Sequence, residues 1–174
     1  LIENLNDINA DIIFIKNIDN VVVQEYVEEI AHYKKVLGGK LLWIQKKVFG
    51  YLTVLEKEEA SIETMSEIKS FLWNELNIKE APTDSEAIFN ILNKPLRVCG
   101  VVENTGAPGG GPFWIKNEDE TTSLQIVEIA QINPDDSRRQ TIVNEATHFN
   151  PVDLVCGVRD YKGNKFDLLK YVDP

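Results

Sequence analysis

The spacing of apolar residues changes at Pro95, and this change restricts the folds available to the chain. Before Pro95 the apolar residues recur at helical spacing, most clearly in the set Leu41, Ile44, Val48, Leu52 and Leu55. After Pro95, short runs rich in β-branched and aromatic residues alternate with turn-forming segments. We therefore expect an α/β fold in which a helical insert near residues 24–94 precedes a strand-rich part at 95–174.

Local signals divide the first part of the chain further. A β-branched and aromatic run at 11–16 predicts a buried strand that ends in the turn residues 17–20. The helical pattern of 24–58 predicts a break or kink at Gly38-Gly39. Ser61 is expected to cap the next helix, and a capping box at 83–86 to open a short helix that runs to about Asn93. These helices form one block, which could pack as a lobe of its own.

The second part carries four predicted strands and one helix. The strands fall at 96–103, 113–115, 123–129 and 152–159. Asn133-Pro134 has the composition of a helix start, which predicts a helix from there to about Val143. The segment 160–164 is expected to be a tight turn.

Composition excludes several classes of protein. The 174 residues contain 43% hydrophobic residues and suit one domain with a real core. A net charge of −10 argues against a nucleic-acid partner, because phosphate binding needs a basic face. No apolar run approaches the roughly 20 residues that span a bilayer, and no signal peptide is evident, so we expect no membrane partner and a cytoplasmic location.

The two cysteines and the single methionine carry information about context. Cys99 and Cys156 both lie in apolar, strand-like runs, so we expect two buried free thiols in a reducing compartment. Met65 is the only methionine, so the sequence has no initiator methionine at its start. We therefore expect 1–174 to be a single partial domain, a fragment whose partner is the remainder of its own longer chain.

Asp19 is the first candidate for chemistry. It follows a predicted buried strand, at the strand end where open α/β sheets bind ligands. A carboxylate there can hold Mg²⁺, which usually shares its oxygen ligands with a substrate phosphate. The alternative is an Asx turn that only stabilises the strand end.

A glycine-rich segment at 104–112 is the second candidate. Gly109, Gly110 and Gly111 would let the backbone approach a ligand and point N–H groups at an anion. No Gly-Lys-Ser/Thr follows, and a strand rather than a helix comes next, so neither a Walker loop nor a dinucleotide fingerprint is present. The alternative is a mobile connection between two strands.

Three polar residues in the second part are further candidates for substrate binding. Glu128 is predicted to lie inside an apolar strand, where it is either at a sheet edge or lining a pocket. Asn150 could present its amide to sugar hydroxyls, and Asp153 could accept a hydrogen bond from one. The alternative for 148–153 is that Asn-Pro only starts a strand after a turn.

Four segments closely resemble a bacterial family known as domain of unknown function 4301. They are 11–22 (DIIFIKNIDNVV), 95–113 (PLRVCGVVENTGAPGGGPF), 123–131 (SLQIVEIAQ) and 147–160 (THFNPVDLVCGVRD). The resemblance covers almost the whole chain. Members of that family are about three times as long as this chain, which would place the fragment in the middle or late part of such a protein.

The order of these motifs is also similar to that in eukaryotic-type UDP-sugar pyrophosphorylases. Asp19-Asn20 matches a Val-Asp-Asn strand end, and Glu128 matches the first Glu of a Val-Val-Glu-Tyr-Ser-Glu strand. Phe149-Asn150 matches the start of a Phe-Asn-Ala-Gly-Asn segment. The resemblance implies a mixed sheet of the nucleotide-diphospho-sugar transferase type, a metal-holding role for Asp19, and sugar contacts from Glu128 and Asn150.

Two functions from different classes follow as hypotheses. The first is a segment of a nucleotidyltransferase that couples a nucleoside triphosphate to a sugar 1-phosphate with release of pyrophosphate, using Mg²⁺. Such chemistry depends on positioning and charge neutralisation, so it needs no protein nucleophile, and the sequence shows no nucleophile set. The fragment by itself would be inactive. The second hypothesis is a non-catalytic module that binds a nucleotide sugar or another protein, and the sequence leaves the choice open.

Overall fold

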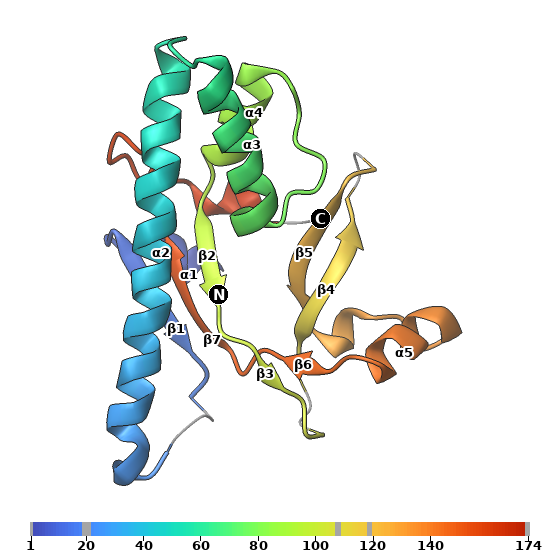
Figure 1. Cartoon of the computed structure of the whole chain (residues 1–174). Coiled ribbons are helices and arrows are strands. Elements are labelled where there is room, and N and C mark those ends of the chain that lie inside the picture. Colours follow the sequence, from blue (N-terminus) through green and yellow to red (C-terminus); the bar gives the residue numbers. More distant parts are fainter. Residues whose placement is uncertain (1, 19–21, 107–108, 118–119, 173–174) are drawn as a thin grey trace.

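The computed structural model describes residues 2–18, 22–106, 109–117 and 120–172 and shows a mixed α/β chain (Figure 1). Its helices are α1 (Ile2–Asp7), α2 (Val27–Glu56), α3 (Ile62–Leu76), α4 (Ser85–Leu92) and α5 (Ser137–Asn144). Three short 3₁₀ helices are η1 (Gln24–Tyr26), η2 (Ile129–Gln131) and η3 (Leu168–Tyr171). The strands are β1 (Ile12–Lys16), β2 (Leu96–Cys99), β3 (Val102–Glu103), β4 (Gly111–Lys116), β5 (Thr122–Val127), β6 (His148–Phe149) and β7 (Asp153–Gly157).

A three-stranded antiparallel sheet lies at the centre of the fold, in the order β1-β7-β2. Its register places Val155 of β7 between Phe14 of β1 and Val98 of β2. Val155 is fully buried, and α2 runs along this sheet (Figure 1). The central strand therefore comes from the end of the chain and is flanked by two strands from earlier segments.

Two smaller strand pairs complete the architecture. β3 pairs with β6, and β4 pairs with β5 in a hairpin that stands to one side of the helices (Figure 1). A hydrogen bond of 2.5 Å, donated by Arg97 of β2 to the side-chain oxygen of Gln125 of β5, connects the central sheet to this hairpin. Every strand pair among the described residues is antiparallel, so the mixed sheet that we expected is not observed.

The helical block shares its core with the sheet. Residues of α2, α3 and α4 form one buried cluster that includes Leu52, Leu72 and Ile88, and Leu96 and Val98 of β2 pack against it. The predicted cap of α3 is confirmed, because Ser61 accepts a hydrogen bond from the Thr64 N–H. The capping box predicted at 83–86 is not observed, because Asp84 is the N-cap of α4 and accepts a hydrogen bond from the Ala87 N–H.

The expected break at Gly38-Gly39 is wrong. α2 continues through both glycines as one helix of 30 residues. Gly38 is buried against β1, and a Cβ there would lie 2.9 Å from Cζ of Phe14, whereas a Cβ at Gly39 would meet nothing within 4 Å. Burial of the α2 face outweighs the cost of about 1 kcal/mol that each glycine imposes on a helix.

Two further boundaries differ from expectation. The helix predicted from Asn133-Pro134 begins at Ser137, because Asp136 caps it and Asn133 instead forms a turn by accepting a hydrogen bond from the Asp136 N–H at 3.3 Å. The predicted strand 96–103 is divided into β2 and β3. The division falls at Gly100, whose N–H bonds to the Asp153 carbonyl oxygen at 2.8 Å outside the β2–β7 register.

Candidate functional site

Asn150 is the centre of the region in which the predicted site residues meet. It lies between β6 and β7, and its side chain is buried, with 4% of the residue exposed. Its backbone N–H donates to the Gly110 carbonyl at 2.8 Å. Its side-chain Nδ2 donates to the Gly100 carbonyl at 2.5 Å, and Oδ1 accepts from the Val152 N–H at 3.1 Å. The hydrogen bonds of Asn150 therefore link the glycine-rich segment to the residue that follows β2.

Glu128 also lies against the glycine-rich segment. A Cβ on Gly110 would lie 3.0 Å from Cδ and Oε1 of Glu128, so the carboxylate covers that glycine closely. The expectation that Glu128 lies inside a strand is wrong, because β5 ends at Val127 and Glu128 is exposed. Its N–H donates to Oε1 of Gln131 at 3.0 Å, which starts the 3₁₀ helix η2 instead of extending the ladder.

The described glycines of the loop are required by the backbone. Gly109 has a φ of 148°, which disfavours any residue with a side chain. Gly111 is buried, and a Cβ there would lie 3.0 Å from the His148 carbonyl oxygen. Residues 107–108 lie outside the described part of the chain. The glycines therefore allow β4 to begin directly against β6.

Asp153 has a partner that the sequence did not suggest. Its Oδ1 lies 2.6 Å from Nζ of Lys34 on α2, and about a quarter of each side chain is exposed. The two residues are 119 positions apart, so no local spacing could have linked them. The ion pair places one cation beside the region where β7 begins.

Asp19 lies outside the described residues, and only the end of its strand can be placed. Lys16 of β1 pairs with Asp153, and the Asn17 N–H donates to the Val152 carbonyl at 3.1 Å. The end of β1 thus adjoins the start of β7. The structure brings Gly109–Gly111, Glu128 and Asn150 into one cluster, and Asp153 joins it through Gly100.

Two hollows of the described structure lie away from this region. One hollow of about 50 Å³ lies between α2 and β2, and another of about 560 Å³ lies at the start of α4. Among the described residues, none of Gly109–Gly111, Glu128, Asn150 and Asp153 lines either hollow. Within the described ranges, no three His, Cys, Asp or Glu side chains gather as a metal site would require.

The two thiols are poorly suited to nucleophilic chemistry. Cys99 and Cys156 are free and partly buried. Burial raises the pKa of Cys99 against the opposing effect of Arg97. Burial, followed by the neighbouring Cys99, raises the pKa of Cys156 to about 11. Both cysteines therefore stay protonated near neutral pH.

The model of the family described as Domain of unknown function (DUF4301) matches residues 1–174. The chain belongs to this family. No curated protein and no solved structure matches this DUF4301 chain. In the part of the DUF4301 chain that the structure describes, no helix is both long and apolar enough to cross a bilayer.

Proposed function

We propose that the chain is the sugar-phosphate side of a nucleotidyltransferase site of the nucleotide-diphospho-sugar transferase type. The reaction would join a nucleoside triphosphate to a sugar 1-phosphate and release pyrophosphate. One observation supports the proposal above the others. The segments carrying Gly110, Glu128 and Asn150 lie apart in sequence, yet their atoms come within contact distance.

The proposal gives each of these groups a chemical task. Glu128 is exposed and can accept hydrogen bonds from sugar hydroxyls. Asn150 and the glycines 109–111 would shape the surface on which the sugar lies. Asp19 would hold Mg²⁺ together with substrate phosphates, since Mg²⁺ commonly takes only one or two protein carboxylates.

Lys34 adds the positive charge that such a substrate needs. Its ammonium group is held beside Asp153, next to the strand end that leads to Asp19. A fixed cation neutralises phosphate charge and costs little reorganisation when the reaction proceeds. Lys34 would therefore exchange part of its contact with Asp153 for a phosphate oxygen.

A second function, a non-catalytic module that binds a nucleotide sugar or a protein, is favoured by one observation. The amide of Asn150 is hydrogen-bonded to the backbone at Gly100 and Val152. An amide used in this way supports the loop, and recognition of a ligand then falls to Glu128 and to exposed backbone. Fold by itself does not choose between catalysis and binding.

Pyrophosphate release from the full-length protein distinguishes the two functions. The assay supplies Mg²⁺, a panel of nucleoside triphosphates and a panel of sugar 1-phosphates. Asp19→Ala and Glu128→Gln should each abolish or strongly reduce release. Asp7→Ala is the matched control, because Asp7 is an exposed residue at the end of α1.

Each result has a definite meaning. Release that is lost in Asp19→Ala and kept in Asp7→Ala supports the transferase. If no pair of substrates yields pyrophosphate, nucleotide-sugar binding is measured by calorimetry. Binding that Glu128→Gln removes then supports the non-catalytic module, and the absence of both activity and binding rejects the transferase and the nucleotide-sugar module.

A further inference from the structure

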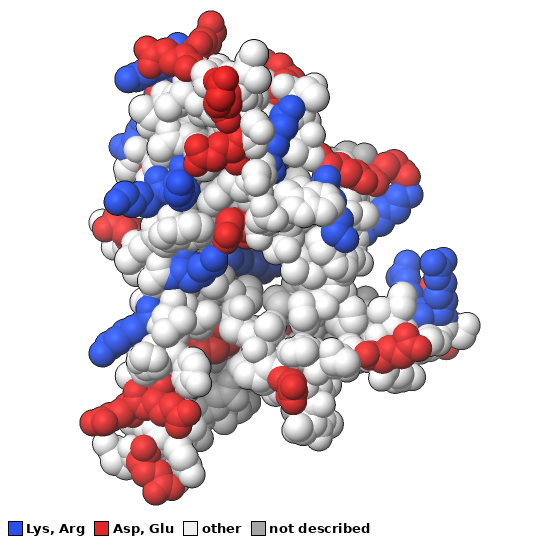
Figure 2. All heavy atoms as spheres, viewed as in Figure 1, with Lys and Arg blue, Asp and Glu red and all other residues white. Residues whose placement is uncertain are grey.

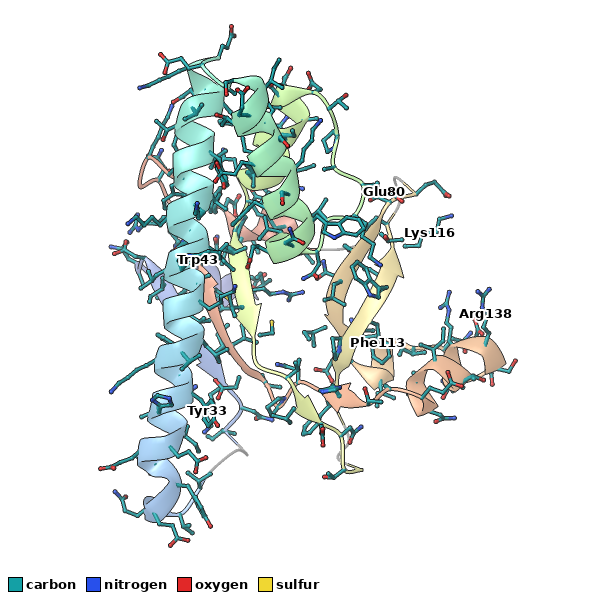
Figure 3. All side chains as sticks on the ribbon, viewed as in Figure 1. Tyr33, Trp43, Glu80, Phe113, Lys116 and Arg138 are labelled. Atoms are coloured by element: carbon teal, nitrogen blue, oxygen red, sulfur yellow. The ribbon has the colours of Figure 1, made fainter. Side chains whose placement is uncertain are left out.

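The first half of α2 extends beyond the core of the molecule. Figure 1 shows α2 reaching well past the end of α3 and past the central sheet. Between residues 27 and 40 only Gly38 is buried, whereas from Leu41 onward a regular buried stripe follows. Tyr33 is 61% exposed and Val36 is 53% exposed, and Figure 3 shows Tyr33 on this projecting part of the helix.

Four exposed residues of this projecting half lie on one side of the helix. They are spaced by four, three and four positions, the spacing of a helix–helix seam, and are Glu29, Tyr33, Val36 and Lys40. We call them the α2 seam. Two apolar residues lie at its middle, an acidic residue at one end and a basic residue at the other.

We propose that the α2 seam pairs in antiparallel orientation with the α2 seam of a second copy of this chain. A two-fold axis between Tyr33 and Val36 sets each Tyr33 opposite the Val36 of the second copy. The same axis sets each Glu29 opposite the Lys40 of the second copy. One register thus satisfies the apolar pairs and the charge pairs together.

The charges of α2 favour a second copy of the chain, in antiparallel orientation, as the partner of the α2 seam. Acidic side chains gather where α2 begins, and basic ones become frequent nearer its middle (Figure 2). A parallel pair would oppose Glu29 to Glu29 and Lys40 to Lys40, which repel. Lys40 already bonds to Glu75 at 2.6 Å, but an ammonium group has three donors and can also serve Glu29 of a second copy.

Sedimentation equilibrium of the purified chain over a wide concentration range tests the pairing. The wild type should self-associate to a dimer, and Tyr33→Asp should remain monomeric. Glu29→Lys and Lys40→Glu should each weaken the dimer by about tenfold or more. In a Glu75→Gln background, which removes the carboxylate that bonds to Lys40, the double variant Glu29→Lys/Lys40→Glu restores opposite charges and should recover most of the affinity of that background.

A charge swap on the other side of the helix is the matched control. Glu28 and Lys35 are exposed residues of the same helix, outside the α2 seam. Glu28→Lys/Lys35→Glu should leave the dimer unchanged. Thermal unfolding by circular dichroism confirms that every variant is folded, and Tyr33→Ser replaces Tyr33→Asp if the latter is not.

Three results would overturn the pairing. The first is a wild-type chain that stays monomeric at the highest concentration. The second is a dimer that survives Tyr33→Asp or Tyr33→Ser. The third is a double charge swap at positions 29 and 40 that is as weak as the single variants, since this would exclude direct contact between those two residues.

Discussion

Replacing Asn150 by alanine should destabilise the fold more than any substitution at an exposed asparagine. Asn150 is the one buried polar residue among the described residues, and its amide bonds to two backbone groups. Asn150→Ala leaves the Gly100 carbonyl and the Val152 N–H without their partner. Val152 also has a φ of 56°, which costs energy for a β-branched residue and depends on that contact.

The expected cost follows from these two hydrogen bonds. Leaving a buried donor or acceptor unpaired costs about 1–3 kcal/mol each. Gly100 and Val152 are only half-buried, so water partly replaces the lost bonds. We therefore expect a loss of about 2–4 kcal/mol, a large share of the roughly 5–15 kcal/mol that stabilises a typical domain.

Urea unfolding followed by circular dichroism measures this loss. Asn144→Ala is the matched control, because Asn144 is exposed at the end of α5, and its change should stay within about 0.5 kcal/mol. A loss below about 0.5 kcal/mol in Asn150→Ala would refute the view that this amide holds the loop.

Asn150→Asp gives an independent test through pH. At neutral pH its carboxylate faces the Gly100 carbonyl, which it cannot bond, so the variant should be unstable. The protonated acid can donate to that carbonyl, which raises the pKa of the new carboxyl in the folded state. Stability should therefore be largest at acid pH and fall as pH rises through that folded pKa. A flat difference from wild type would contradict the bonding arrangement.

Three other outcomes can be measured on the same chain. Gly39→Ala should raise the free energy of unfolding in urea by about 1 kcal/mol. Gly38→Ala should give a free energy of unfolding about 1 kcal/mol lower than Gly39→Ala does, because a Cβ at position 38 crowds Phe14. Equal effects of the two substitutions on stability would contradict that contact. Ser61→Ala should cost about 1 kcal/mol, since it removes the cap on the Thr64 N–H, and an unchanged midpoint would show that the cap is dispensable. In a Cys99→Ser variant, Cys156 should still react with a disulfide reagent at pH 8 about tenfold or more slowly than a free thiol, because burial, the largest cause of its raised pKa, is kept. A rate equal to that of a free thiol would contradict this burial.

The elements built from local contacts were predictable. Helical spacing located α2 and α3, and the residues that cap α3 and α4 marked their starts because capping joins residues three positions apart. The break predicted at Gly38-Gly39 is not observed. Gly38 instead leaves room for Phe14 of β1, a contact between distant segments that the local sequence does not reveal. The predicted strand position of Glu128 failed because a hydrogen bond to Gln131 competes with the ladder.

The residues of the candidate site also divide into those that the local sequence indicated and those that only the structure revealed. The sequence singled out the glycine segment, Glu128, Asn150 and Asp153 by residue type and by their place near turns and strand ends. It had no means of finding Lys34, whose partner Asp153 is 119 residues away. The role of Asp19 stays a prediction, because that residue lies outside the described part of the chain.

The sequence by itself determined the α/β character, the order of the main helices and strands and the acidic surface, since these depend on composition and on residues close together in the chain. Tertiary structure decided that β7 is the central strand, that every described strand pair is antiparallel, and that Asn150 joins Gly100 to Gly110. These arrangements depend on contacts between distant segments. Such contacts are chosen by burial and by hydrogen bonding of the whole chain at once.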